Sequence, residues 1–138
     1  MTEKIAAVAY VRRGDSQILV VRNPRHDTWA MPGGLVEDGE TYEKAVAREL
    51  LEESSLVAKE IEFVGEVEVP EALRVPGRAT RVRLYRVTPH DYYARQREPD
   101  APVAWWTHEQ FLARSKFADI YRDLFVTAGY DGRTEDGL

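Results

Sequence analysis

Residues 48–55 read RELLEESS and place three glutamates, Glu49, Glu52 and Glu53, within five positions. On a helix that turns about 100° per residue, the three carboxylates occupy an arc of roughly 100°. This arc borders the apolar stripe that contains Leu50, so the carboxylates lie at the edge of the buried face. Like charges at this spacing repel one another, and a bound divalent cation would remove the repulsion.

Taken alone, RELLEESS is more typical of a solvated helix face, because glutamate-rich helices are common. The preceding residues change that balance. Gly33 and Gly34 follow a proline, and such a break predicts a tightly turned backbone whose bare carbonyls can approach the helix and complete an oxygen cage. The chain has no cysteine, and its three histidines have no ligand spacing, so any metal would be held mainly by oxygen, which suits Mg²⁺ or Mn²⁺.

The pattern around this stretch predicts an α+β fold. Residues 41–54 form a predicted helix with Thr41 as N-cap and Glu43 in its first turn. The remaining elements follow from alternation, turn residues and helical spacing. We expect a hairpin of strands 5–12 and 17–22, one or two strands over 57–69, strands at 80–88 and 102–106, a helical turn at 107–113 and a helix at 116–127, with loops at 70–78 and 89–99. These elements predict one domain, a mixed sheet with helices on both sides.

Composition excludes several classes of function. The 138 residues suffice for one domain, which we place at residues 1–128, followed by a flexible tail over 129–138. The net charge of −5 argues against a large nucleic acid or an anionic membrane as partner. No apolar run reaches about 18 residues, and the first residues lack the layout of a signal peptide. We therefore expect a cytoplasmic protein.

The spacing of the charged residues resembles a known motif. Gly34 is followed by five residues and Glu40, then by seven residues and Arg48-Glu49-Leu50-Leu51-Glu52-Glu53, with Leu56 three positions later. This resembles the Nudix box of the Nudix hydrolase (MutT-like) superfamily. The flanking residues agree with it, so the resemblance covers residues 4–127. It implies a Nudix-type α/β/α sandwich with a mixed β-sheet.

The resemblance also implies a chemistry. Nudix enzymes use Mg²⁺ or Mn²⁺ to hydrolyse a pyrophosphate bond in a nucleoside diphosphate linked to another moiety. Matching positions make Glu49, Glu52 and Glu53 the metal ligands, joined by the carbonyl of Gly33 or Gly34.

Two further roles follow from the match. Glu40 and Arg48 correspond to the pair that holds the loop and orients the helix glutamates. Glu52 and Glu49 are the alternatives for the general base. Glu98 is a further ligand candidate, although at that loop position a plain surface charge is the stronger expectation. The resemblance leaves a homodimer open, because many members of the family are dimers.

Ser55 is the departure from the motif, which has glycine there. Glycine at that point caps the helix in the left-handed conformation, which serine adopts at a cost of about 1 kcal/mol. We therefore expect the chemistry to persist and the geometry of the helix end to change.

Residues outside the motif are weaker candidates. Arg22, Arg25 and Trp29 are predicted to bind substrate, and His26 follows Arg25. For Arg22, Arg25 and His26, solvated charge is an equal alternative. A second group of arginines, Arg74, Arg78, Arg81 and Arg83, is more typical of a solvated surface. Tyr10, Tyr85 and Trp106 could stack on a base, with core packing the stronger expectation for Trp106. The base, the sugar and the group linked to the pyrophosphate are not encoded by the motif, and a non-catalytic nucleotide-binding or regulatory module is the alternative function.

Overall fold

The computed structural model describes residues 3–130, and strand β1 (Ile5–Tyr10) lies at its centre. Small and large apolar residues alternate along this strand, so Val8 and Tyr10 face one side of the sheet and Ala7 and Ala9 the other. All four are at most 4% exposed. A strand buried on both faces needs a covering layer on each side.

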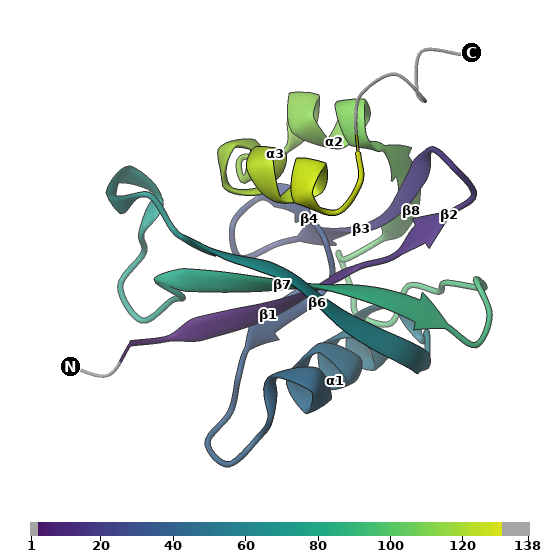
Figure 1. The fold of residues 1–138 in the computed structure, drawn as a ribbon, viewed down its shortest axis with the longest axis horizontal. Coiled ribbons are helices and arrows are strands. Elements are labelled where there is room, and N and C mark those ends of the chain that lie inside the picture. The colour runs from purple at the N-terminus through teal and green to yellow at the C-terminus, as the bar shows by residue number, and fades with distance from the viewer. Residues whose placement is uncertain (1–2, 131–138) are drawn as a thin grey trace.

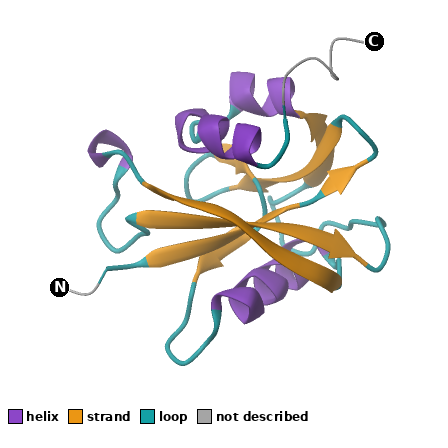
Figure 2. Ribbon diagram, in the orientation of Figure 1, coloured by secondary structure: helices purple, strands orange, loops and turns teal. Residues whose placement is uncertain are grey.

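Helices supply these two layers. Helix α1 (Tyr42–Ser54) covers the side of Ala7 and Ala9, and α2 (His108–Arg114) and α3 (Ala118–Thr127) cover the side of Val8 and Tyr10. Figure 1 shows α1 below the strands and α2 and α3 above them. The strands form the middle layer between the purple helices of Figure 2. The predicted α/β/α sandwich is confirmed.

The first sheet is mixed, as predicted. Its order is β5-β1-β7-β6, in which β1 runs parallel to β7 (Arg81–Pro89) and antiparallel to β5 (Gly33–Leu35). Strand β6 (Ala58–Glu68) is a single long antiparallel strand with two irregularities in its register, which answers whether residues 57–69 form one strand or two. The loop that follows contains a short 3₁₀ helix, η1 (Glu71–Leu73).

The second sheet is antiparallel and is built around β3 (Gln17–Asn23). Strand β8 (Val103–Thr107) pairs along one edge of β3. Strands β2 (Arg12–Arg13) and β4 (Thr28–Ala30) share the other edge, at opposite ends. The loop between β3 and β4 therefore leaves the sheet beside the end of β3, and this loop carries Arg25 and His26.

Two details of the sequence prediction are wrong. The expected hairpin of 5–12 with 17–22 is reduced to β2 against Gln17 and Ile18, because β1 pairs with β5 and β7 in the other sheet. The expected tight turn at Gly33 and Gly34 is an extended strand, β5, and neither glycine has a positive φ angle. Their lack of a side chain serves close packing instead.

The helices agree closely with the sequence. Thr41 caps α1, and its side-chain oxygen accepts a hydrogen bond from the backbone N–H of Lys44 at 3.1 Å.

No helix among residues 3–130 is both long and apolar enough to cross a lipid bilayer. The predicted tail over 129–138 stays a prediction; within it, the ring of Tyr130 stacks on buried His108 with centroids 4.3 Å apart. The rest of that tail lies outside the described residues.

Candidate active site

Glycine lets the glutamate face of α1 lie against β5. A Cβ atom added to Gly34 would come within 2.5 Å of Glu49 Oε1, and one added to Gly33 would come within 2.6 Å of the carbonyl oxygen of Ala7. The backbone N–H of Gly33 donates a hydrogen bond to Glu53 Oε2 at 2.8 Å. Gly34 therefore leaves room for the Glu49 carboxylate against bare backbone, and Gly33 lets β5 lie close to the backbone of β1.

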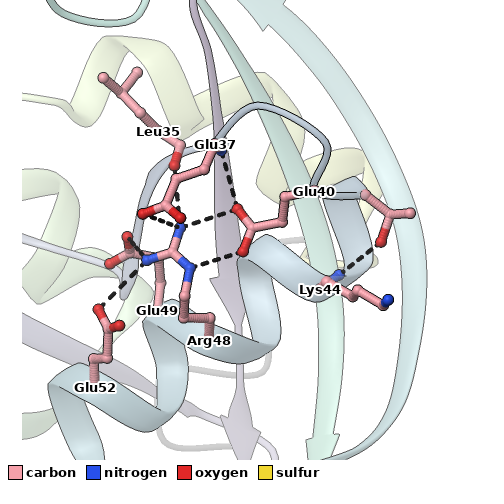
Figure 3. A network of polar contacts seen from close by, with 8 residues as sticks. Leu35, Glu37, Glu40, Lys44, Arg48, Glu49 and Glu52 are labelled. Carbon is pink, nitrogen blue, oxygen red and sulfur yellow. Dashed lines mark hydrogen bonds and ion pairs between the residues drawn. The ribbon is translucent and has the colours of Figure 1, made fainter.

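Arg48 organises the other carboxylates, as Figure 3 shows. Its guanidinium donates from Nε to Glu40 Oε2 at 2.8 Å and from Nη2 to Glu40 Oε1 at 3.1 Å, a two-point contact. Nη1 donates to Glu49 at 2.9 Å and to Glu52 at 3.4 Å. Nη2 also donates to the carbonyl of Leu35 at 3.3 Å. One side chain thus ties the loop before α1 to the glutamates of α1.

The charges in this network are mutually stabilised. Hydrogen bonds from Arg48, followed by that from the backbone N–H of Glu37, lower the pKa of Glu40 to about 2. The hydrogen bond with Glu40 in turn raises the pKa of Arg48. Both groups are therefore ionised over the whole physiological range, which suits a brace.

The pKa values of Glu49 and Glu53 are raised, whereas that of Glu40 is lowered. Burial raises the pKa of Glu49, against the hydrogen bond from Arg48. Burial, and next the charge of Glu49, raise the pKa of Glu53 to about 9, although the Gly33 N–H lowers it. Two half-buried carboxylates, of which only Glu49 is paired with Arg48, form a site at which a cation would be strongly stabilised.

The donors suit a divalent cation but are not arranged around one. Within residues 3–130, no three carboxylate or imidazole side chains converge into a ready metal cluster. Glu52, whose side chain is 51% exposed, is turned toward Arg48 and away from such a cluster. All three donors are nevertheless carboxylates on one face of α1, and two of them are half-buried, which fits a hard cation such as Mg²⁺. Gly33 donates its N–H to Glu53, and the contact of the Gly33 or Gly34 carbonyl with a metal stays a prediction.

A cavity of about 620 Å³ lies over this face. It is lined at one side by Arg48 and the three glutamates of α1, together with Glu98 from the loop after β7. Glu98 also raises the pKa of both Glu49 and Glu53 through its charge. The structure therefore brings Glu98 to the carboxylates, whereas its sequence position favoured a plain surface charge.

The predicted substrate-binding residues divide into two groups. Arg22 and Arg25 line the cavity, as does His26, and Arg22 is ion-paired with Asp27. Trp29 does not line it, because its ring packs on Trp106 with centroids 4.6 Å apart. The other aromatic candidates, Tyr10 and Tyr85, are fully buried in the core.

Sequence reasoning missed Glu37 and the separate role of Arg78. Glu37 lies 3.8 Å from Arg48, and only its place inside the 34–56 stretch could have marked it. The expected cluster of four arginines does not exist as one surface. Arg78 lines the cavity, Arg74 donates to the carbonyl of Val69, and the β7 arginines Arg81 and Arg83 pair with acidic residues.

The end of α1 explains how Ser55 replaces glycine. Ser55 takes the left-handed conformation with φ 70° and ψ 0°, and its N–H donates to the carbonyl of Leu51. Its hydroxyl accepts a hydrogen bond from Arg97 Nη1 at 3.3 Å, and the N–H of Arg95 donates to the carbonyl of Ser54 at 2.8 Å. The helix end thus contacts the loop that carries Glu98.

Comparisons with known proteins place the chain among relatives of one family. The NUDIX domain family matches this chain over residues 2–126. A MutT-like protein of Streptomyces ambofaciens is 30% identical over 96% of this chain and 84% of its own. An ADP-ribose pyrophosphatase of Methanocaldococcus jannaschii is 40% identical over 47% of this chain and 40% of its own. The crystal structure of a MutT NUDIX hydrolase from Burkholderia pseudomallei matches with a TM-score of 0.66 at 25% identity, over 79% of this chain and 86% of that one.

Proposed function

This chain belongs to the Nudix hydrolase family, and on that premise we propose that it hydrolyses a pyrophosphate bond in a nucleoside diphosphate linked to another moiety. One observation carries the proposal. Glu49 and Glu53 are held against the bare backbone of Gly33 and Gly34 at the wall of a cavity large enough for a nucleotide. A solvated acidic helix would have no reason to bury two carboxylates in this way.

We assign the cofactor as Mg²⁺ or Mn²⁺, held by Glu49, Glu52 and Glu53. When bound, such an ion neutralises the charge of a pyrophosphate and lowers the pKa of a water molecule. The protein contributes the placement of the ligands. Arg48 fixes Glu49, while the N–H of Gly33 fixes Glu53, so the two buried carboxylates keep one orientation.

Glu52 is our assignment for the general base. Its side chain is half exposed, and its contact with Arg48 at 3.4 Å is the longest that Arg48 makes with an α1 glutamate. It is therefore the carboxylate that can turn to a water molecule and accept its proton. Glu49, with its 2.9 Å contact to Arg48, remains the alternative base.

The ligand that we propose is a small nucleotide derivative, of the triphosphate, nucleotide-sugar or dinucleotide type. The similarity to an ADP-ribose pyrophosphatase supports the nucleotide-sugar class, over about half of the chain. A cytoplasmic location and a homodimer belong to the same proposal.

Chromatography of the nucleotide products tests the proposal, after incubation with a panel of nucleoside triphosphates, ADP-ribose and dinucleotides in the presence of Mg²⁺ or Mn²⁺. ADP-ribose should give AMP and ribose 5-phosphate, and a triphosphate should give a nucleoside monophosphate and pyrophosphate. Glu53→Gln and Glu52→Gln should lower turnover about 10²- to 10⁴-fold while the protein stays folded. Glu43→Gln is the matched control, because Glu43 is exposed in the first turn of the same helix and does not line the cavity. Wild-type rates in both site variants would refute the site, and tight binding without cleavage would identify the regulatory module instead.

A further inference from the structure

The cavity has a second charged region, which is basic. Arg25 and His26 reach it from the loop between β3 and β4, and Arg78 reaches it from the loop between β6 and β7. We call these three residues the basic end. The ring of His26 is held edge-on by Phe117, with centroids 5.4 Å apart, and its backbone carbonyl accepts a hydrogen bond from Lys116 Nζ at 3.2 Å. Two loops far apart in sequence therefore bring cations to one place.

The charge of the basic end is not neutralised by the protein. In the part of the chain that the structure describes, no carboxylate forms an ion pair with Arg25 or Arg78. The arginines of β7 show the contrast, since Arg81, Arg83 and Arg86 are each paired with a glutamate of β6. Burial, and then the charges of Arg78, Arg25 and Lys116, lower the pKa of His26. Unpaired cations gathered in a cavity favour an anionic ligand.

The basic end is separate from the glutamates. The glutamates lie on α1, which covers one side of the strands. The ring of His26 packs on Phe117, the N-cap residue of α3, which covers the other side. The cavity wall also contains apolar side chains, among them Met31, Val82 and Ile120. Such a wall suits a ring or a sugar face, and it does not suit a continuous chain of phosphates.

We propose that Arg25, His26 and Arg78 form a second phosphate subsite, which binds a phosphate monoester that a sugar or ring separates from the scissile pyrophosphate. This assignment rests on the proposed function, because it places the pyrophosphate at the glutamates. It narrows the substrate to nucleoside diphosphate derivatives that carry an additional phosphate. Arginine recognises such a dianion through paired N–H donors, and two arginines from different loops can hold it from two sides.

Binding without turnover tests the subsite directly. The affinities of AMP, adenosine 2′,5′-bisphosphate and adenosine 3′,5′-bisphosphate are measured by calorimetry in EDTA, so that the result does not depend on metal or hydrolysis. At least one bisphosphate should bind tenfold or more tightly than AMP. The double variant Arg25→Ala/Arg78→Ala should lose that gain and keep the affinity for AMP within about twofold. Arg122→Ala is the control, because Arg122 is exposed on α3 and does not line the cavity.

Two results would overturn the proposal. Either both bisphosphates bind no tighter than AMP, or the gain survives in the double variant. Added NaCl should weaken bisphosphate binding more steeply than AMP binding, since the subsite acts through charge.

Turnover separates this inference from the proposed function. The wild type should hydrolyse ADP-ribose 2′-phosphate with a different kcat/KM from ADP-ribose, and the double variant should bring the two values together. Equal values in the wild type would count against the subsite while leaving hydrolysis intact. Loss of both activities in Glu53→Gln, together with unchanged bisphosphate binding in EDTA, would show that the two ends act independently. A preference for nucleoside triphosphates over both forms of ADP-ribose would indicate that the cavity binds a continuous chain of phosphates. It would contradict a sugar or ring between the pyrophosphate and the second phosphate.

Discussion

Arg48 and Arg81 are two arginines that each contact several glutamates, yet they do different things. Arg48 contacts Glu40 and Glu49, whose side chains are only 13% and 16% exposed. Arg81 contacts Glu66 and Glu68, whose side chains are 30% and 63% exposed. The number of ion pairs is similar, but only those of Arg48 hold carboxylates out of water.

The burial of the carboxylates, and not the number of ion pairs, therefore distinguishes the Arg48 network from that of Arg81. Exposed pairs such as Arg81 with Glu68 contribute about 0–1 kcal/mol each, because water screens them. They also follow simply from the register of β6 and β7, which places Glu68 opposite Arg81 and Glu66 opposite Arg83. A buried carboxylate instead depends on its partner, since removing the partner leaves a desolvated charge.

The largest expected effect comes from replacing Arg48 by alanine, and Arg81→Ala is the variant to compare with it. Arg48→Ala should lower kcat/KM about 100-fold or more, because small displacements of catalytic groups have effects of that size. It should also lower the free energy of unfolding by about 2–3 kcal/mol, somewhat less than for a fully buried pair. Arg81→Ala should change kcat/KM less than about threefold and stability by less than about 1 kcal/mol. Steady-state kinetics and urea unfolding measure both.

Arg48→Lys sharpens this comparison. Lysine keeps the charge but cannot make the two-point contact with Glu40, so activity should fall between wild type and Arg48→Ala. If Arg48→Ala and Arg81→Ala had equal effects, the distinction between the two networks would fail.

The sequence predicted much of this network, for a physical reason. The helix period and the fixed distances from Gly34 to Glu40 and from Glu40 to Arg48 are local properties, and Thr41 starts α1 where its side chain can cap it. The contact of Arg48 with Glu40 spans only eight residues, so a turn and two helical turns suffice to bring them together.

Contacts between distant segments could not be predicted in the same way. Glu98 and Arg78 reach the cavity through loops whose paths depend on the whole fold. Trp29 faces Trp106 because β3 pairs with β4 on one edge and with β8 on the other, a pairing that one-dimensional patterns do not encode. The arginines at 74, 78, 81 and 83 looked alike in sequence, and only strand register separated the paired from the unpaired ones.

The second effect concerns stability without metal. The pKa of Glu53 is raised to about 9 in the folded protein from its usual 4.5, so folding takes up a proton between these values. The carboxyl therefore favours the folded state fully below pH 4.5 and loses that contribution as pH rises toward 9. Glu53→Gln needs no proton and should gain about 1–3 kcal/mol of stability over wild type at pH 8 in EDTA, with little gain at pH 4.5.

Thermal melting from pH 4.5 to 9 measures this gain. Mg²⁺ should stabilise the wild type and leave Glu53→Gln nearly unchanged, which separates the metal from the proton. Glu68→Gln serves as the control, because the side chain of Glu68 is 63% exposed. A gain that does not grow with pH would contradict the burial of Glu53.

A smaller effect is expected at acid pH. Hydrogen bonds from Arg48 lower the pKa of Glu40 to about 2 from its usual 4.5. The Glu40 carboxylate therefore contributes stability above pH 4.5 and loses it as pH falls toward 2. Glu40→Gln should be less stable than wild type at pH 6, and the difference should shrink steadily between pH 4.5 and pH 2. Chemical denaturation at five pH values tests this, and a difference that stays constant below pH 4.5 would contradict it.

The smallest effect concerns Ser55, where strain and a hydrogen bond oppose each other. The left-handed conformation of Ser55 costs about 1 kcal/mol relative to glycine, and the exposed hydrogen bond from Arg97 returns about 0.5 kcal/mol. Ser55→Gly should therefore have nearly the stability of the wild type, within about 0.5 kcal/mol, because the lost hydrogen bond and the greater chain entropy of glycine offset the relieved strain.

Ser55→Ala separates the two contributions. Alanine keeps the strain and loses the hydroxyl, so this variant should be less stable than wild type by about 0.5 kcal/mol. If the bond from Arg97 positions the loop of Glu98, both variants should change kcat/KM by a similar small factor, whereas Ser55→Ala should lose more stability than Ser55→Gly. Urea unfolding and steady-state kinetics measure the two effects. Equal destabilisation by glycine and alanine would mean that the hydroxyl, and not the backbone conformation, decides the geometry of this helix end.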